Sequence, residues 1–258
     1  MPKYTGDAMT LEKYFIWFIF YSFLGWVYET IYCSIADRKL VNRGFLNGPY
    51  CPIYGFGAII NIVILGGLTN KFLIFLCGVI LTGILEYATS YGMEKIFHAK
   101  WWDYSTRKFN INGRVCLLGM VVFGIMSVLV VAYLHPFVKE VTQKIPLFTL
   151  HTIGIVSFLI FAFDTVYTNV KIHGFNKRIA QLSAKIRENV DLGIENAAAH
   201  IDAAKTTIDA AKATLEDTIA AFKKKMNFQE RRIMRAFPKL KFIRYDDIMS
   251  KIRKNKEK

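Results

Sequence analysis

Five long apolar runs constrain the fold of this chain more than any other feature of its sequence. They are Tyr14–Ala36, Tyr54–Leu68, Phe72–Tyr91, Val115–Leu134 and Leu150–Val170. A helix that crosses a bilayer needs about 20 largely apolar residues, and every run except Tyr54–Leu68 meets that length. The short run is expected to be tilted, broken or re-entrant. The sequence therefore predicts an all-α fold, a polytopic membrane bundle of about five transmembrane helices.

Composition divides the chain into an apolar part and a charged part. The 258 residues are 53% hydrophobic, yet the net charge is +14, a pairing that soluble proteins rarely tolerate. We expect a transmembrane domain over residues 1–171, a long amphipathic, coiled-coil-like cytoplasmic helix over 172–226, and a basic tail over 227–258. No basic region directly precedes the first run, and no small-residue cleavage site follows it, so the first run is expected to remain as a helix.

The distribution of Lys and Arg predicts the orientation of the spans. One set of basic residues follows the first, third and fifth runs: Arg38, Lys39, Arg43, Lys95, Lys100, Arg107, Lys108, Arg114 and the tail. Fewer lie on the other side: Lys3, Lys13, Lys71, Lys139 and Lys144. Cytoplasmic loops carry the excess of positive charge. The pattern predicts an external N-terminus and a cytoplasmic C-terminus.

The stretch FLNGPYCPIYGFG, residues 45–57, places turn-forming residues beside apolar sequence. A proline in the first turn of a helix would explain only one of its two prolines. Irregular backbone at membrane depth is tolerated where it packs in protein or lines a watery cavity. We therefore expect a structured loop packed against the helices at the inner membrane face.

Ionisable residues inside the apolar runs are candidates for function, because each costs about 2.5–3.5 kcal/mol at a helix centre on insertion scales. With the polar residues of the two cytoplasmic loops, they form one predicted ligand or ion-pair cluster: Glu29, Arg43, Asn47, Glu86, Glu94, Asp103, Arg114 and Asp164. The alternative is structural, with Arg114 pairing with an acid to join helices. Four aromatic residues are expected at the membrane interface: Trp26, Trp101, Trp102 and Tyr104.

Neither a metal site nor a cofactor is expected. The four cysteines, Cys33, Cys51, Cys77 and Cys116, form no CxxC pair and no zinc-type spacing with histidine. They are interpreted as small packing residues. No Ser/His/Asp or Cys/His arrangement for nucleophilic catalysis occurs in order, so an enzyme is the less favoured class.

Several motifs resemble those of a known family. They are GWVYE (25–29), GFLNGPYCPIYGFGA (44–58), LEYATSYGMEKIFHAKWWDYS (85–105) and FNINGRVCL (109–117). In this order they resemble the bacterial family named putative ABC-transporter type IV, or CmpB-like, over about residues 14–135. The resemblance implies a multispan protein of the bacterial cell membrane and no particular substrate. The chain lacks the GxxxxGK[ST] loop of an ATPase, so any ATPase would be a separate subunit.

The charged part carries a heptad pattern. Its apolar positions recur every seven residues at Ile194, Ile201, Ile208, Leu215 and Phe222, with alanines between them. A continuous helix over residues 175–222 would be about 70 Å long. Because alanine buries little area, we expect this seam to self-associate or to pack on a protein partner. A solvated single helix is the alternative.

The basic tail favours contact with membrane lipid. Its Lys and Arg residues alternate with Phe, Ile and Met, a composition typical of segments that lie on anionic lipid. Nucleic-acid binding is the less favoured alternative, because no recognised nucleic-acid motif occurs.

Three functions remain open from the sequence. The first is a transport or export component, permease-like, with a polar vestibule on the cytoplasmic side. The second is a membrane scaffold or assembly protein that acts through its C-terminal helix. The third is an intramembrane enzyme that acts on lipid, with a carboxylate as base and an arginine on phosphate.

Overall fold

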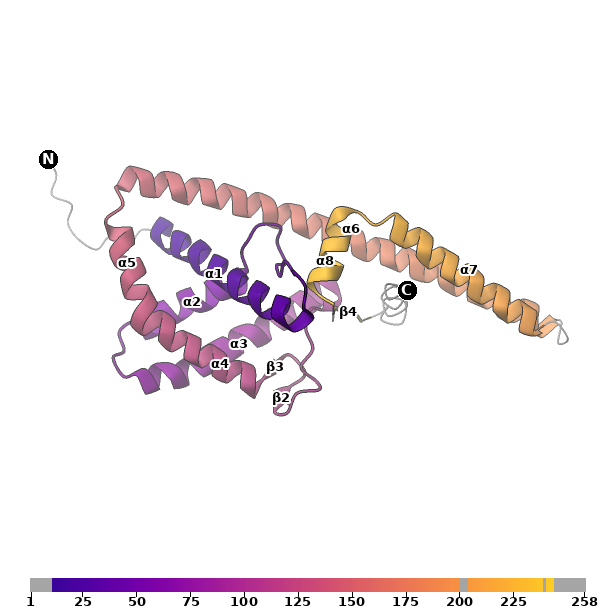
Figure 1. Cartoon of the computed structure of the whole chain (residues 1–258), viewed down its shortest axis with the longest axis horizontal. Coiled ribbons are helices and arrows are strands. Elements are labelled where there is room, and N and C mark those ends of the chain that lie inside the picture. Colours follow the sequence, from indigo (N-terminus) through magenta and orange to yellow (C-terminus); the bar gives the residue numbers. More distant parts are fainter. Residues whose placement is uncertain (1–10, 200–203, 239, 244–258) are drawn as a thin grey trace. The chain divides into compact units, whose positions relative to one another are not determined.

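The structure is a computed structural model that describes residues 11–199, 204–238 and 240–243. It divides into two compact units, drawn as a cartoon in Figure 1. Unit 1 comprises Met1–Gly92 and Trp102–Thr168, and unit 2 comprises Met93–Trp101 and Asn169–Lys258. The division falls within the longest helix, so one helix contributes residues to both units.

Helices dominate both units. The elements of the first part of the chain are α1 (Leu11–Asp37), α2 (Pro52–Leu65), α3 (Lys71–Phe97), β1 (Ala99–Lys100), β2 (Asn110–Ile111), β3 (Val115–Cys116) and α4 (Leu117–Val128). They are followed by the π-helical η1 (Leu129–Leu134), α5 (His135–Gln143), α6 (Leu147–Ala199), α7 (Ala204–Lys224), α8 (Phe228–Ala236) and β4 (Lys241–Phe242). The all-α membrane bundle expected from the sequence is confirmed.

In the part of the chain that the structure describes, four helical stretches are long and apolar enough to cross a membrane. They are Leu11–Ala36, Lys71–Phe97, Leu117–Gln143 and Leu147–Asn189. The remaining apolar run forms α2, whose 14 residues extend about 21 Å. That length is less than the hydrocarbon core of about 30 Å. Four helices, rather than five, therefore have the length of a full span.

The packing of α1 shows how the chain runs through unit 1. Side chains of α1 meet those of α6 in ascending order in both helices, at Phe15–Phe158 and Phe18–Phe161, with ring centroids 5.6 and 5.4 Å apart. These two helices are therefore parallel. Residues of α1 meet those of α2 in descending order, with Gly25 beside Tyr54 and Trp17 clustered with Ile62. Helix α2 therefore runs back along α1.

Helices α3 and α4 are antiparallel in the same way. Gly78 lies beside Ser127 and Gly83 beside Met120, both at positions where an added Cβ would collide with the facing side chain. The chain thus passes along unit 1 five times with alternating direction. The second of these passes is made by α2 together with the irregular segment that precedes it.

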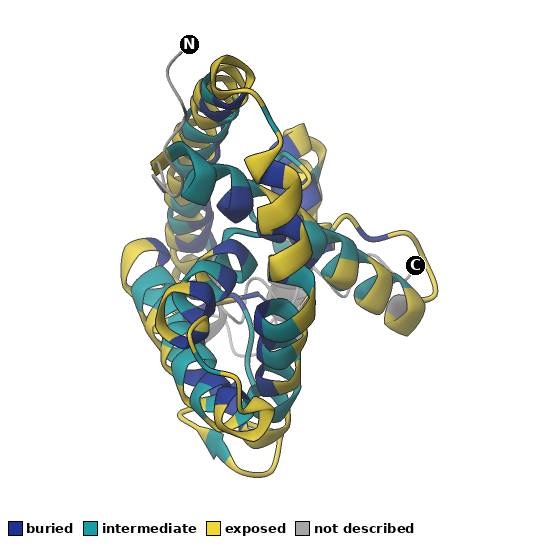
Figure 2. Ribbon diagram, turned by 90° about the vertical axis from the view of Figure 1, so that its left-hand side faces the viewer, coloured by how far each residue is buried: buried dark blue, intermediate teal, exposed yellow. Residues whose placement is uncertain are grey.

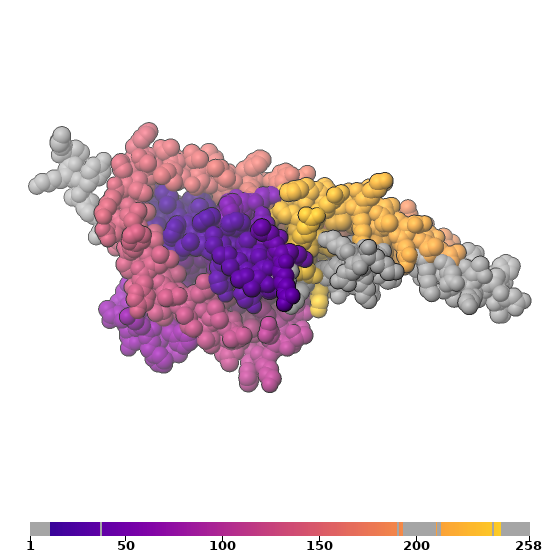
Figure 3. All heavy atoms as spheres, viewed as in Figure 1, coloured from indigo at the N-terminus to yellow at the C-terminus, as the bar shows by residue number. Residues whose placement is uncertain are grey.

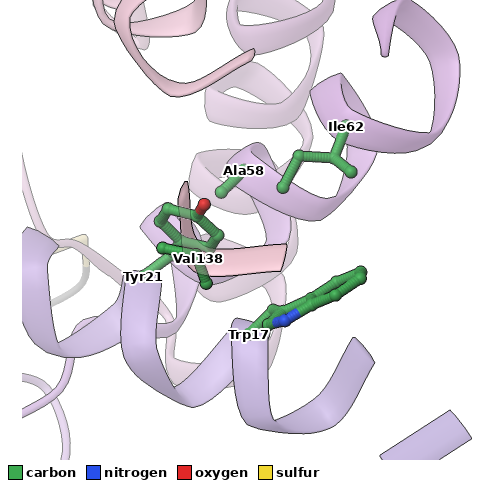
Figure 4. Packing of buried hydrophobic residues seen from close by; sticks show 5 residues of the cluster. All are labelled: Trp17, Tyr21, Ala58, Ile62 and Val138. Carbon is green, nitrogen blue, oxygen red and sulfur yellow. The ribbon is translucent and has the colours of Figure 1, made fainter. Parts of the chain in front are cut away.

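A cluster of buried side chains in unit 1 joins α1, α2 and α5. Figure 4 shows this cluster, with Trp17, Tyr21, Ala58, Ile62 and Val138 pointing toward one another. The Trp17 indole also donates a hydrogen bond of 3.0 Å to the Thr142 hydroxyl. The end of unit 1 away from the loops is therefore fixed by aromatic packing and by a buried hydrogen bond.

The outer surface of unit 1 is apolar and its interior is partly polar. Ile80, Ile84 and Phe163 are 58, 63 and 73% exposed, and Figure 2 shows the exposed residues on the outward faces of the helices. The space-filling view shows α1 (indigo) reaching this surface, where Ile35 is 73% exposed. Several polar side chains are buried, namely Ser22, Asn61, Glu86, Ser127, Asp164 and Thr168. This distribution suits a protein whose solvent is lipid.

Unit 2 corrects the expectation of one continuous helix over residues 175–222. Helix α6 ends at Ala199, α7 begins at Ala204, and the rings of Phe175 and Phe222 stack 6.5 Å apart. A straight helix would place these two residues about 70 Å apart, so the expectation is wrong. Helix α7 returns to α6, and buried Ile179 and Ile219 belong to the core of unit 2.

The heptad seam is described only in part. The Phe222 side chain contacts Phe175 and lies 5.3 Å from the Arg178 guanidinium, so at that position the seam packs within the chain. Leu215 is half-buried. The side chains of Ile194, Ile201 and Ile208 lie outside what the structure describes. Self-association through those residues stays a prediction.

Part of the expected basic tail folds into unit 2. Helix α8 begins with a capping box, in which Asn227 and Glu230 bond each other's backbone N–H groups. The buried Glu230 carboxylate also accepts two hydrogen bonds from Arg178, at 2.5 and 2.7 Å. The short antiparallel pair β1–β4 and the Trp101–Phe237 ring contact complete the attachment. Residues 244–258 lie outside the described part.

The close approach of α1 and α2 gives a test of unit 1. A Cβ added at Gly55 would lie 2.6 Å from the Phe18 carbonyl oxygen, whereas one at Gly57 would meet only Leu85, at 3.5 Å. We expect Gly55→Ala to lower the free energy of unfolding by about 1–3 kcal/mol, because backbone cannot move aside. Gly57→Ala is the matched control and should not destabilise, since alanine favours a helix by about 1 kcal/mol. Thermal unfolding in detergent measures both, and equal midpoints would contradict the predicted packing.

Candidate functional site

The irregular segment before α2 packs along the second half of α1. The Trp26 indole donates to Asn42 Oδ1 at 2.8 Å, and the Val41 N–H donates to Ser34 Oγ at 3.0 Å. At the far end of the segment, the Cys51 N–H donates to the Ser22 carbonyl at 2.8 Å. The segment therefore lies beside residues 22–34 of α1, at the depth of a predicted span. This position explains why it is rich in turn residues and yet apolar.

One carboxylate of α6 organises this segment. Asp164 Oδ1 accepts hydrogen bonds from the Asn47 backbone N–H at 3.1 Å and from the Asn47 side-chain amide at 2.7 Å. The Thr168 hydroxyl donates to the same oxygen at 3.1 Å. Asp164 Oδ2 accepts from the Gly48 N–H at 2.8 Å and from the Tyr50 hydroxyl at 2.6 Å. Five donors from the chain thus converge on one carboxylate.

These five donors give Asp164 a structural role. A carboxylate offers about four lone-pair positions, so the chain itself fills the capacity of this group. The bonds also satisfy the backbone of Asn47 and Gly48, which have no helix or strand to pair with. Gly48 is required because a Cβ at that position would overlap the Tyr50 ring. Asp164, a member of the predicted ligand or ion-pair cluster, thus joins the segment to α6.

Glu29 lies on the other side of the same segment. Its Oε1 accepts a hydrogen bond of 2.6 Å from the Tyr54 hydroxyl of α2, and its Oε2 is 3.6 Å from Arg43 Nε. The Cys33 thiol approaches Oε2 at 3.8 Å. Both oxygens of Glu29 therefore already have partners within the chain.

The loop between α3 and α4 forms a small folded structure over residues 102–116. Strands β2 and β3 pair as a hairpin, with Asn112 and Gly113 at positive φ in its turn. The Tyr104 N–H donates to the Gly113 carbonyl at 2.8 Å, and the Trp102 indole donates to the Arg114 carbonyl at 2.9 Å. Residues 102–104 are thereby fixed against the hairpin, which sets the direction of the Tyr104 side chain.

Tyr104 connects this loop to the carboxylate of α3. Its phenol hydrogen-bonds to Glu86, a residue that is only 5% exposed. Burial raises the pKa of the Tyr104 phenol well above its usual value, and the charges of Glu86 and Glu29 raise it further. The phenol therefore remains protonated and can donate. Glu86 Oε2 is buried and has no hydrogen-bond partner among the described residues.

The remaining predicted residues take other positions. The Arg114 guanidinium lies over the rings of Tyr87 and Tyr91, 5.6 and 5.3 Å from their centroids. Its expected salt bridge to an acid stays a prediction. Asp103 Oδ1 accepts from the Ser105 N–H at 3.0 Å and so closes a local turn. Glu94 is half-buried and belongs to unit 2.

The expected interfacial aromatic set is corrected at one residue. Trp101 is 3% exposed and packs edge-on against Phe97 and Phe237, with centroids 5.7 and 4.9 Å away. A ring buried in this way lies in the core of unit 2 and cannot lie among lipid headgroups. Trp26 and Trp102 are half-buried and use their indole N–H groups within the chain.

Several residues of the site were not identified from the sequence. Tyr50, Tyr54 and Thr168 bond the predicted carboxylates, and Asn61 is buried in α2. Each lies in or next to an apolar run, where a hydroxyl or amide requires a partner. The sequence therefore indicates that these groups need hydrogen-bond partners, but it does not specify which acid each group bonds.

The apolar surface, the polar interior and the four spanning helices define a multi-pass membrane protein. A family model described as putative ABC-transporter type IV matches residues 16–169. Because the match covers more than half of the chain, the protein belongs to this family. No curated protein matches the chain, and no solved structure matches it either.

Asp164 can be tested as the group that anchors the irregular segment. Asp164→Ala removes the acceptor of the half-buried Asn47 and Gly48 N–H groups. A fully buried N–H group left without an acceptor costs about 1–3 kcal/mol, which is the upper range for these two. We expect hydrogen exchange at Asn47 and Gly48 to accelerate and the unfolding midpoint in detergent to fall. Asp191→Ala, an exposed acid on the same helix, is the control and should change neither quantity.

Asp164→Asn retains one oxygen and should give an intermediate effect, which keeps the test informative if the alanine variant does not fold. Unchanged protection of Asn47 and Gly48 in Asp164→Ala would contradict the anchoring role.

Proposed function

We propose that the protein is a permease-like transport or export component of the bacterial cell membrane. Membership of a transporter-type family supports this, as does the set of polar groups at one end of the helices. The observation that carries the proposal is a cavity of about 240 Å³ within unit 1 that Glu86 helps to line. A buried acidic residue among those that line a cavity suits solute binding better than a scaffold.

The three carboxylates of the site divide between support and binding in this proposal. Asp164 and Glu29 are engaged by the chain, and they hold the segment over residues 38–51 in place. Glu86 is the one of these three with an oxygen that lacks a partner among the described residues. The solute would therefore meet Glu86, while the two folded loops form the cytoplasmic rim of the vestibule.

The π-helical segment η1 also supports a binding role for the cavity. Leu129, Val130 and Leu134 belong to this segment and line the cavity. Pro136 follows closely and cannot donate a backbone hydrogen bond, which accounts for the altered pattern of bonds before it. Single π-helical turns are common at functional sites, because they displace side chains from the regular helical positions.

Three kinds of partner are proposed: a separate ATPase subunit, anionic lipid and a second copy of the chain. Energy from ATP would have to come from a separate ATPase subunit, because the sequence contains no phosphate-binding loop of that type. Exposed Arg231 and Arg235 of α8 are suited to anionic lipid. A homo-oligomer through the heptad seam is proposed for its Ile194–Ile208 part.

The proposed orientation places the N-terminus outside and the C-terminus in the cytoplasm, following the excess of Lys and Arg on one side. In intact cells, a cysteine introduced at Glu140 should react with a membrane-impermeant thiol reagent, and one at Ser105 should not. Both positions are exposed in the structure. In inverted vesicles the two labels should exchange. The opposite pattern in intact cells would place the polar vestibule outside and would contradict the proposal.

Transport itself can be tested without a known solute. Inverted membrane vesicles with and without the protein are incubated with a small-molecule extract, with and without ATP, and their contents are compared by mass spectrometry. We expect at least one solute class to accumulate or to be depleted with the wild type and with Glu140→Gln, but not with Glu86→Gln. Glu140 is the control because its side chain is 64% exposed on α5. Equal contents in all vesicles would contradict a transport function.

A further inference from the structure

The cavity in unit 1 is bordered by α1, α2, α3 and the helix that contains η1. Its volume is about 240 Å³, and its walls are largely apolar, with Leu24, Leu85, Phe123 and Val130 among them. The polar residues of the lining decide which class of ligand it can hold, because a polar ligand is oriented by polar atoms that face it.

The hydroxyl groups of the lining already have partners in the protein. Thr82 and Ser127 donate to backbone carbonyls four residues earlier in their own helices, at 2.6 and 2.8 Å. The Tyr54 hydroxyl donates to Glu29 at 2.6 Å, and the Tyr21 hydroxyl lies 3.2 Å from a histidine ring nitrogen. These groups therefore do not require a ligand.

The two other polar residues of the lining are Asn61 and Glu86. Asn61 Oδ1 and Glu86 Oε2 have almost no accessible surface, so neither atom faces the cavity. The Asn61 amide nitrogen donates to the Gly57 carbonyl at 2.8 Å, and Tyr104 donates to Glu86. The polar side chains of the lining are thus engaged by the chain or shielded from the cavity, which leaves apolar contact as what it offers a ligand.

The cavity lies near the middle of the bilayer. Leu24, Leu85 and Leu129 line it, and each lies at or within one residue of the middle of a helical stretch of 27 residues. Such a helix is about 40 Å long, whereas the hydrocarbon core is about 30 Å thick, so the middle of the helix falls within the core. At this depth the surroundings of the protein are the ends of lipid chains.

The cavity also reaches the surface that faces lipid. Leu129 lines the cavity and is 53% exposed, and Ile125, four residues earlier on the same helix, is 51% exposed. The mouth at Leu129 therefore opens into hydrocarbon. Water does not fill a cavity of this kind, since a buried water needs two or more polar partners and apolar cavities stay dry.

We propose that this cavity holds the end of an acyl chain of a membrane lipid. Chain ends are the apolar groups that the bilayer places at this mouth, whereas a soluble apolar compound would have to pass through lipid to reach it. An apolar cavity of about 150 Å³ binds benzene, so one of about 240 Å³ has room for about nine carbon atoms. The headgroup of the lipid stays at the interface, outside the cavity.

The inference goes beyond the proposed transport function, because a chain bound here is a ligand of the protein even if no solute is transported. A transported solute would have to displace this chain or carry a similar one. Binding of the chain is measured without any transport, so either proposal can fail while the other stands.

Photolabelling tests the inference on the purified full chain in phosphatidylcholine nanodiscs. A fraction of the lipid carries a diazirine either at the end of one acyl chain or beside its carboxyl group, and mass spectrometry of peptides maps the labelled residues after illumination. We expect the terminal diazirine to label Leu24 and Phe123 in the cavity, and the carboxyl-side diazirine to label neither. Ile84, at the same depth and 63% exposed, is the reference for the outer surface.

Two matched variants assign the label to the cavity. In Gly57→Leu the added Cβ would meet only Leu85, at 3.5 Å, and both residues line the cavity, so the new side chain fills part of it. Each methylene excluded weakens binding about fourfold, so labelling of Leu24 and Phe123 should fall about tenfold or more. Gly92→Leu adds the same side chain where an added Cβ meets nothing within 4 Å and should label as the wild type. Labelling of Ile84 should stay unchanged in both variants.

Labelling of Ile84 without labelling of Leu24 or Phe123 in the wild type would overturn the proposal and leave the cavity to a smaller solute. Undiminished labelling of these two residues in Gly57→Leu would also overturn it, because the label would then come from outside the cavity. If Gly57→Leu does not fold, the comparison of the two diazirine positions on the wild type decides.

Discussion

The structure of unit 1 depends on one constraint: backbone polar groups at membrane depth have no water to bond. The segment over residues 38–51 reaches the Ser22 carbonyl in the middle of α1 without forming a helix. Its N–H groups at Asn47 and Gly48 are satisfied by Asp164 instead. The acidic residue inside a span and the irregular segment beside α1 therefore depend on each other. The segment supplies hydrogen-bond donors to the buried carboxylate, and the carboxylate supplies an acceptor for N–H groups that have no helical partner. This pairing also explains how a helix of 14 residues can serve in a chain that passes five times along the unit.

The three buried or half-buried carboxylates of unit 1 differ in how far the chain satisfies them. Asp164 receives five donors, and Glu29 receives Tyr54 with Arg43 nearby. Glu86 receives Tyr104, and its second oxygen is buried without a partner among the described residues. Saturated acids support structure, because moving or removing them leaves several donors unpaired. An acid with remaining capacity is where a solute can add binding energy, and this distinction assigns different roles to residues that look alike in the sequence.

The C-terminal part illustrates a limit of periodicity. The heptad positions predicted an apolar stripe that ends at Phe222, but such a stripe can pack on a second chain, on a partner or on its own chain. Phe175 and Phe222 are 47 residues apart and stack within unit 2, a contact that no local pattern encodes. Likewise Glu230, in the segment expected to be a basic tail, is buried and pairs with Arg178 of the long helix. Net charge described the composition of that region but not its packing.

The sequence by itself determined that lipid surrounds this protein and that its fold is helical. It also identified the turn residues and the acids that are unusual inside apolar sequence. Runs of about 20 apolar residues suit only a bilayer or a fully buried core, and the turn residues at 45–57 could be placed from their chemistry alone. It also placed Glu29, Glu86 and Asp164 in the latter halves of helices that run in parallel. Only the tertiary structure decided which donors each acid meets, because hydrogen bonds over more than 100 residues, such as Tyr50 with Asp164, depend on how the helices pack. The cavity beside Glu86 has the same origin, since it is formed by side chains of four separate helical segments that meet only in the folded chain.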